Sequence, residues 1–223
     1  MTKANVCSLI LSMKTSNIEI LEKSLFLFSQ KGYTTTTVRD IAKEIGITQS
    51  SLYKHFESKE AILNAIFDEM KIRYDRESER LSLHIDGERE EDKELFGTID
   101  GEKIANTVVK LIRFSMEETF VKNFRKLLTT LQFTDPKYAK LYSTRYGERM
   151  ISYHEDLFKT FITKGLMKKE DPHALAIAYV APIFFLLGIA DREEDRKEEC
   201  LNQIKEHVIL FHSTYSELKN EKI

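Results

Sequence analysis

Residues 37–63 have the sequence TVRDIAKEIGITQSSLYKHFESKEAIL, which holds the capping and turn residues of several short helices. Thr37 is a helix-capping residue, and Asp40 three positions later completes a capping box. Gly46 suits the positive φ that a sharp helix end requires. Thr48 is placed to cap a second short helix. The stretch therefore predicts two short helices joined by a tight turn.

The second short helix is expected to bury only one side. Leu52 and Phe56 are four residues apart and share a face. The side chains left outside the core are those of Gln49, Ser50, Ser51, Tyr53, Lys54 and His55. Ser58 then caps a third helix, whose apolar residues recur at helical spacing from Ile62 onward. Two helices joined in this way match a helix-turn-helix, whose second helix enters the major groove of DNA.

The polar side chains of this unit suit DNA. A glutamine amide can pair with adenine, hydroxyl groups bind base edges or phosphates, and lysine and arginine neutralise phosphates. The predicted DNA-binding residues are Thr36, Thr37, Arg39, Thr48, Gln49, Ser50, Ser51, Tyr53, Lys54, His55 and Lys59. The spacing alone also permits a structural helical hairpin with a solvated polar face. The threonines before the first short helix can likewise serve as caps, as phosphate ligands, or as both.

The order of the residues is more specific than their spacing. It comprises Gly32-Tyr33, Thr36-Thr37-Val38, Ile41-Ala42, Gly46-Ile47, Leu52-Tyr53-x-His55-Phe56 and Ser58-Lys59-Glu60-x-x-Leu63. This pattern closely resembles the DNA-binding domain of the tetracycline-repressor (TetR) family of bacterial transcription regulators. The resemblance covers residues 16 to 70 and implies a homodimer that binds operator DNA and responds to a small-molecule effector.

Composition and charge fit this interpretation. Eight glycines and three prolines in 223 residues leave few interruptions, and the apolar pattern has a helical period, which favours an all-α fold. The net charge of −2 excludes a polycation that coats nucleic acid in bulk. Residues 31–59 hold five basic and three acidic side chains, whereas residues 76–100 hold four basic and nine acidic ones. DNA binding therefore has to come from a local basic patch.

The expected division of the chain follows from these patterns. Residues 16–75 are predicted to form a three-helix helix-turn-helix DNA-binding domain, and residues 76–223 a helical effector-binding and dimerisation domain. The first helix spans 18–31 and the anchor helix 58–83, before a linker over 84–100. Further helices are expected over 102–118, 119–132, 136–164, 172–190 and 193–218. Asp-Pro pairs at 135–136 and 171–172 mark two of their starts.

The cysteines, the apolar runs and the N-terminal residues indicate in which part of the cell the protein is expected. Cys7 and Cys200 form no metal or disulfide framework, which is typical of a cytoplasmic protein. No apolar run is expected to reach the ~20 residues of a membrane span, so no membrane partner is predicted. The apolar residues near the N-terminus weakly resemble a signal peptide but lack its cleavage pattern. An upstream extension over residues 1–12, with Met13 as an alternative start, fits better.

The last two helices have the character of an interface. Residues 172–190 are apolar almost all round, with Pro182 predicted to kink the helix. The final helix carries apolar residues at spacings of three and four, as helix bundles do. The predicted homodimer interface is Tyr179, Ile183, Leu186, Leu201, Ile204, Val208, Phe211 and Tyr215. Packing within one subunit remains an alternative, because periodicity does not identify the partner.

An effector pocket is expected among the aromatic residues between 102 and 190. The candidate lining is Phe114, Met116, Phe120, Phe124, Tyr142, Tyr146, Arg149, Tyr153, His154 and Phe184. Apolar walls with a few polar groups are typical of ligand sites, although aromatic residues at helical spacing also build plain cores. The effector is expected to be small and partly apolar.

Catalytic patterns are missing from the sequence. His154, Glu155 and Asp156 are consecutive and point in different directions, and no H-E-x-x-H, Gly-rich phosphate loop or G-x-S-x-G motif occurs. We expect no enzyme activity, no cofactor and no metal site. A helical small-molecule-binding or interaction protein with a purely structural helix-turn-helix is the alternative to a DNA-binding regulator.

Overall fold

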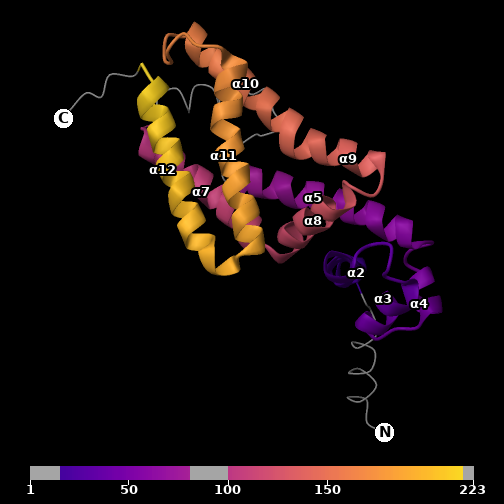
Figure 1. Ribbon diagram of the computed structural model, residues 1–223. Helices are drawn as coiled ribbons and strands as arrows, with labels where there is room; N and C mark the ends of the chain where they lie inside the picture. Colours follow the sequence, from indigo (N-terminus) through magenta and orange to yellow (C-terminus); the bar gives the residue numbers. More distant parts are fainter. Residues whose placement is uncertain (1–15, 81–99, 218–223) are drawn as a thin grey trace.

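The computed structural model describes residues 16–80 and 100–217, and the fold of these residues is all-α, as predicted (Figure 1). The N-terminal part contains α2 (Asn17–Lys31), α3 (Val38–Ile45), α4 (Gln49–Tyr53) and α5 (Lys59–Arg80). The remainder contains α7 (Gly101–Glu117), α8 (Thr119–Leu131), α9 (Pro136–Ser143), α10 (Arg149–Thr163), α11 (Pro172–Arg192) and α12 (Lys197–Tyr215). A π-helical turn (Thr144–Glu148) joins α9 to α10, and a 3-10 turn (Glu194–Arg196) precedes α12.

The helix ends follow from local chemistry. The Ser16 hydroxyl accepts from the Glu19 N–H at 3.1 Å and caps α2. Asp171 caps α11 by accepting from the Ala174 N–H at 2.7 Å, with a proline in the first turn. The expected helix over 136–164 is interrupted by the π-helical turn, and the last helix begins at Lys197 rather than at residue 193.

The first hydrophobic core extends beyond the helix-turn-helix. Leu25 and Phe28 of α2 and Ile66 of α5 are fully buried in it. Phe124 and Leu128 of α8 belong to the same core, because α8 packs on α2 and α5. The N-terminal domain is therefore stabilised from outside the predicted 16–75 range.

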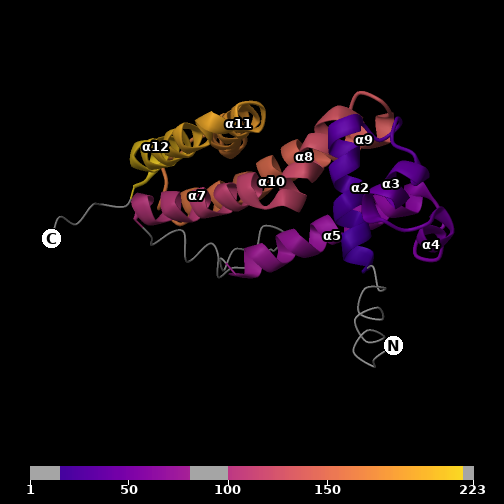
Figure 2. The ribbon, with the colours of Figure 1, turned by 90° about the horizontal axis from the view of Figure 1, so that it is seen from below.

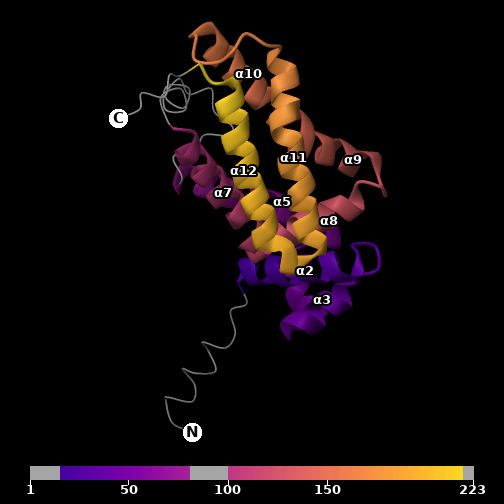
Figure 3. The ribbon, with the colours of Figure 1, turned by 60° about the vertical axis from the view of Figure 1, so that its left-hand side comes forward.

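The second hydrophobic core lies among α7, α10, α11 and α12. Figure 2 shows α11 and α12 as a layer on one side of the molecule, over α7 and α10. In Figure 3 these two helices again lie side by side. The Lys168 N–H donates to the Tyr215 carbonyl at 2.8 Å, which ties the end of α12 to the loop between α10 and α11.

Helix α11 corrects one expectation. By length and composition it could cross a membrane, and it is the one helix of the described residues with that property, whereas the sequence was expected to contain no such run. Core helices of soluble proteins share this composition. In its most apolar 18-residue window 39% of the residues are buried, against α10 and α12, so the outer side of α11 stays uncovered within one subunit.

Three expectations fall outside the described residues. These are the N-terminal extension over 1–12 with a start at Met13, the end of the anchor helix at residue 83, and the linker predicted over 84–100, apart from Asp100, which caps α7. The kink predicted at Pro182, which lies inside α11, stays a prediction.

Candidate DNA-binding surface and ligand cavity

Helices α3 and α4 form the predicted helix-turn-helix. The Thr37 hydroxyl accepts from the Asp40 N–H at 3.1 Å, while Asp40 accepts from the Thr37 N–H at 2.9 Å. The Thr37 hydroxyl also donates to the Asp40 carboxylate at 2.6 Å, and this bond, together with the one from the Thr37 N–H, holds the pKa of the Asp40 carboxyl below its usual value. Gly46 has φ +83°, a left-handed conformation that few residues other than glycine adopt. The Thr48 hydroxyl then accepts from the Ser51 N–H and starts α4.

Helix α4 presents its polar side to solvent. Leu52 is 1% exposed and anchors the helix in the first core. The exposed residues on and beside α4 are Gln49, Ser50, Tyr53, Lys54 and His55, with Ser51 half-buried. The His55 Nδ1 lies 2.8 Å from the Asn17 Oδ1, which connects the end of α4 to the start of α2. Arg39 of α3 is exposed as well, and α3 and α4, which carry these residues, lie at one end of the molecule (Figure 1).

Two residues predicted to bind DNA support the turn before α3 instead. Thr36 is fully buried and its hydroxyl donates to the Gly32 carbonyl at 2.8 Å, so the prediction is wrong for Thr36. The Lys59 ammonium donates to the carbonyls of Tyr33 and Thr36, both at 2.8 Å, and lies 4.4 Å from the centre of the Tyr33 ring. Partial burial lowers the Lys59 pKa. Lys59 therefore stabilises the turn before α3 through these hydrogen bonds.

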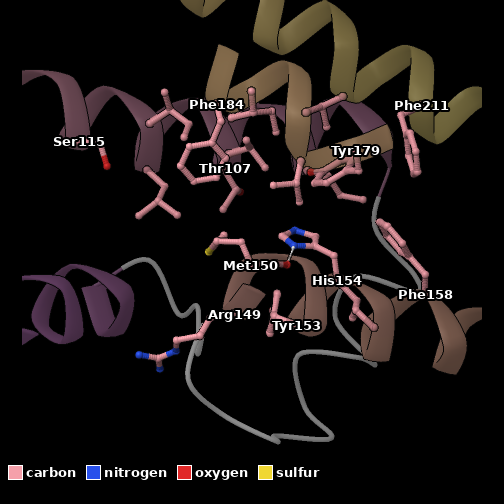
Figure 4. Close-up of a pocket in the computed structure, with 18 of the residues that line it drawn as sticks. Thr107, Ser115, Arg149, Met150, Tyr153, His154, Phe158, Tyr179, Phe184 and Phe211 are labelled. Atoms are coloured by element: carbon pink, nitrogen blue, oxygen red, sulfur yellow. Dashed lines mark hydrogen bonds between the residues drawn. The ribbon is translucent and has the colours of Figure 1, made fainter. Parts of the chain in front are cut away.

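A cavity of about 240 Å³ lies in the C-terminal part of the molecule (Figure 4). Its walls come from α5, α7, α10, α11, α12 and the π-helical turn. Five of the ten predicted lining residues contribute to it: Tyr146, Arg149, Tyr153, His154 and Phe184. The other five, Phe114, Met116, Phe120, Phe124 and Tyr142, are outside its lining.

The five misplaced residues belong to the hydrophobic cores. Phe120 and Phe124 of α8 are almost fully buried in the first core, where α8 packs on α2, and Phe114 and Tyr142 pack against that core. Met116 is buried in the second core. The predicted lining also omitted the face of α7 that lines the cavity. Its members, Ile104, Thr107, Val108, Leu111, Ile112 and Ser115, recur at helical spacing, a signal that was available.

One end of the cavity is aromatic. Phe158 and Phe211 lie at the same end in Figure 4, and their ring centres are 5.4 Å apart. The Nδ1 of His154 donates to the Met150 carbonyl at 2.8 Å, the dashed line in Figure 4. Burial lowers the pKa of His154 to about 4, so its ring is neutral at pH 7. Burial also raises the pKa of the Tyr179 hydroxyl, and this end therefore carries no charge.

The opposite end of the cavity is polar and adjoins α5. The Tyr74 hydroxyl lies 2.9 Å from the Ser115 Oγ, which joins α5 to α7. The guanidinium carbon of Arg145 lies 4.8 Å from the centre of the Tyr74 ring and 5.5 Å from that of Phe124. The Arg145 Nε and the Tyr146 hydroxyl are both buried and have no hydrogen-bond partner within the described residues. Burial raises the pKa of that tyrosine.

Two arginine clusters connect the ends of the molecule. Arg73 of α5 pairs with Glu22 of α2 at 2.9 Å, Glu69 at 2.7 Å and Glu118, the cap of α8, at 2.5 Å. Arg125 of α8 is 5% exposed and donates to both carboxylate oxygens of Asp191 on α11, at 2.5 and 2.6 Å. Helix α8 thus contacts α5 of the N-terminal part through one cluster and α11 through the other.

Six of the eight predicted dimer residues are covered within the described fold. Tyr179, Ile183, Leu201, Ile204, Val208 and Phe211 are buried in the second core, whereas Leu186 and Tyr215 pack against it and are half-buried. Packing within one chain, the alternative interpretation, accounts for these six residues. The exposed apolar side of α11 comprises Ala174, Ile177, Ala178, Ala181 and Phe185. Leu210 of α12 is also exposed. We call these six residues the outer apolar face.

Comparisons with known proteins agree with the geometry of the N-terminal part. Residues 20–66 match the family model described as bacterial regulatory proteins, tetR family. Over 44 residues the chain is 50% identical to the biofilm operon icaADBC HTH-type negative transcriptional regulator IcaR of Staphylococcus aureus (strain Newman). The matched segment is 20% of this chain and 24% of that protein. The match thus spans about a quarter of the length of this curated relative.

Solved structures match over most of the chain. SmeT, the repressor of the Stenotrophomonas maltophilia multidrug efflux pump SmeDEF, aligns with a TM-score of 0.61 at 17% identity, over 92% of this chain and 93% of SmeT. A TetR transcription regulator from Haloarcula marismortui aligns with a TM-score of 0.64 at 14% identity, over 90% and 98% of the two chains. At these identities the likeness establishes the fold.

Proposed function

Because the chain carries the DNA-binding domain of the TetR family of bacterial regulators, we propose that it is a ligand-responsive transcription regulator, and specifically a repressor. The observation that carries the proposal is the α3–α4 unit, in which Leu52 is buried while the polar side of α4 is exposed. Its similarity to IcaR, a negative regulator, supports repression.

In the proposed complex α4 lies in the major groove. Gln49 contacts a base edge, because it is exposed in the first turn of α4, where recognition helices contact bases. Arg39, Tyr53 and Lys54 contact phosphates. The exposed or half-buried hydroxyls of Thr37, Thr48, Ser50 and Ser51, and the His55 ring, complete the proposed DNA surface.

The proposed regulator is a homodimer that pairs through the outer apolar face. Phe185 and Leu210 are 68% and 65% exposed in one subunit, and a second copy would remove them from water. A two-fold pair of α11 and α12 would form a four-helix interface. A dimer of this kind contacts two half-sites about 34 Å or a multiple apart, so the operator is near-palindromic.

The proposed effector binds in the cavity and releases the DNA. The cavity is mostly apolar, with polar groups at the end near α5, and α5 begins in the DNA-binding domain. SmeT, a structural neighbour, is known in complex with triclosan. In this proposal the effector prefers a dimer conformation in which the distance between the two DNA-binding domains does not match the operator half-sites. Such an effector weakens DNA binding, and DNA weakens effector binding by the same factor.

We propose residues 16–75 as the DNA-binding domain, residues 76–223 as the effector-binding and dimerisation domain, and the cytoplasm as the location.

The test is DNA binding by the full chain to the region upstream of its own gene. We expect sequence-selective binding that weakens steeply with salt. Gln49→Ala should relax the preference at one base position, whereas Lys54→Ala should weaken specific and random DNA alike. Absence of salt-sensitive, sequence-selective binding would favour the alternative, an interaction protein with a structural helix-turn-helix. Equal losses for both variants on both DNAs would refute the division of roles.

A further inference from the structure

The polar end of the cavity contains a cation without an anionic partner. Arg145 lines the cavity and makes no ion pair within the described residues. The rings of Tyr74, Phe124 and Tyr146 surround its guanidinium, at 4.8, 5.5 and 5.9 Å from ring centre to guanidinium carbon. Ring faces attract a cation, but a guanidinium has five N–H donors that favour carboxylate or phosphate oxygens.

A neighbouring hydroxyl is also unused. The Tyr146 Oη is buried without a hydrogen-bond partner in the described part of the chain. Arg145 and Tyr146 both belong to the π-helical turn, and π-helical segments inside α-helices occur frequently at functional sites. The turn therefore brings two polar side chains with unused donors to the same end of the cavity.

The rest of the cavity requires an apolar ligand body. Met150 lies between Ser115 at the polar end and Phe158 and Phe211 at the other end in Figure 4, and Ile112 and Ile183 also line the cavity. Figure 4 places Ser115 at one end and these two aromatic rings at the other. The volume of about 240 Å³ is slightly below the usual ~300–1,000 Å³ of ligand pockets, which indicates a compact ligand.

We infer that the cavity binds a compact monocarboxylate with an alkyl or aryl body, its carboxylate at Arg145 and its apolar end against Phe158 and Phe211. Lys71, Arg149 and Asp75 also line the cavity, so with Arg145 the described part of its lining holds three basic side chains and one acidic one, which suits an anionic head group. This inference rests on the proposed function and specifies the chemical class of the effector.

The site adjoins the helix that leaves the DNA-binding domain. Tyr74 contacts Arg145 through its ring and Ser115 through its hydroxyl, and Arg73, the next residue, pairs with Glu22 of α2. A carboxylate at Arg145 would compete with the ring of Tyr74 for the guanidinium. The ligand head would therefore act directly on α5.

The test compares three eight-carbon probes by calorimetry on the full chain: octanoate, neutral octanamide and cationic octylammonium. Octanoate should bind at least about tenfold more tightly than either of the others. Arg145→Met should remove that preference and leave octanamide binding within about twofold. Arg76→Met is the matched control, because Arg76 is exposed on α5 and does not line the cavity; it should bind all probes like the unsubstituted protein.

Equal binding of octanoate and octanamide by the unsubstituted protein would overturn the inference, as would undetectable octanoate binding or an unchanged preference in Arg145→Met. The comparison among probes needs no variant, so it decides even if Arg145→Met fails to fold, and Arg145→Gln provides a second substitution. DNA binding is measured on the same preparation without probe. Loss of DNA binding with an intact octanoate preference refutes the proposed function alone, and the reverse result refutes the carboxylate site alone.

Discussion

His154 is the residue whose proton binding the fold changes most clearly. Its ring donates from Nδ1 to the Met150 carbonyl and packs 4.9 Å from the Tyr179 ring, centre to centre. Burial lowers its pKa from 6.5 to about 4. Between these two values the unfolded chain binds more protons than the folded one, so stability rises with pH in this range.

The first prediction follows from that difference. The free energy of unfolding should fall as the pH drops from 6.5 to 4, by about 3 kcal/mol from His154, and no further loss from this residue is expected below pH 4. His154→Gln should reduce the dependence, as measured by urea unfolding at pH 7.5 and 4.5. Part should remain, because burial also lowers the pKa of His212. An identical pH dependence in the variant would contradict the prediction.

The second prediction separates Lys59 from Lys54. Lys59→Met keeps the alkyl chain but removes the hydrogen bonds to the Tyr33 and Thr36 carbonyls, so the free energy of unfolding should fall by about 1–3 kcal/mol. Lys54 is exposed, and Lys54→Met should change that free energy by less than about 0.5 kcal/mol while weakening DNA binding. Chemical denaturation and gel shift of both variants provide the comparison. Loss of DNA affinity without loss of stability in Lys59→Met would contradict this prediction and indicate that Lys59 contacts DNA.

At the scale of elements, α8 is the connector between the two parts of the molecule. Its apolar residues complete the core beneath α2, and its cap Glu118 shares Arg73 with Glu22. Its Arg125 is paired with Asp191 of α11. A rigid element with ionic contacts to both parts of the molecule can transmit a shift from the cavity side to the N-terminal side.

The third prediction concerns Arg73. Arg73→Met leaves the carboxylates of Glu22, Glu69 and Glu118 without their shared cation, so α2 should open more readily than the C-terminal helices. Hydrogen exchange of α2 amides should accelerate about tenfold or more, while that of α12 stays unchanged. Arg76→Met, an exposed neighbour on α5, is the control and should leave both unchanged. Uniform acceleration in both helices would show a global loss of stability instead.

At the scale of the whole molecule, the outer apolar face decides the expected assembly. Figure 2 places α11 and α12 on the outside of the molecule, with α7 and α10 behind them. An apolar stripe on such an exposed layer is typical of an association surface.

The fourth prediction tests this face. Phe185→Glu should convert the proposed dimer to monomers, because it would bury a charge at the proposed interface, and should reduce affinity for the proposed operator at least tenfold. Sedimentation analysis and gel shift measure the two effects. Phe133→Glu is the matched control, since Phe133 is 85% exposed between α8 and α9 and away from the outer apolar face. A dimeric Phe185→Glu protein would exclude this face as the interface.

Local residue order was enough to predict most of the helices, many of their ends and the helix-turn-helix. These features depend on residues three or four positions apart, such as Thr37 with Asp40, or on a single glycine such as Gly46. Interactions of this range are encoded in local residue order, and for that reason the caps and the short helices could be predicted.

Only the tertiary structure decided which face of each helix meets which partner. Apolar spacing marked Val208 and Phe211 as an interface, yet they lie in the core of one subunit, while Phe185 faces outward. The polar end of the cavity depends on Tyr74 and Ser115, which are 41 residues apart in sequence. Periodicity defines an apolar face but not its neighbour, because neighbours are selected by packing among segments distant in the chain.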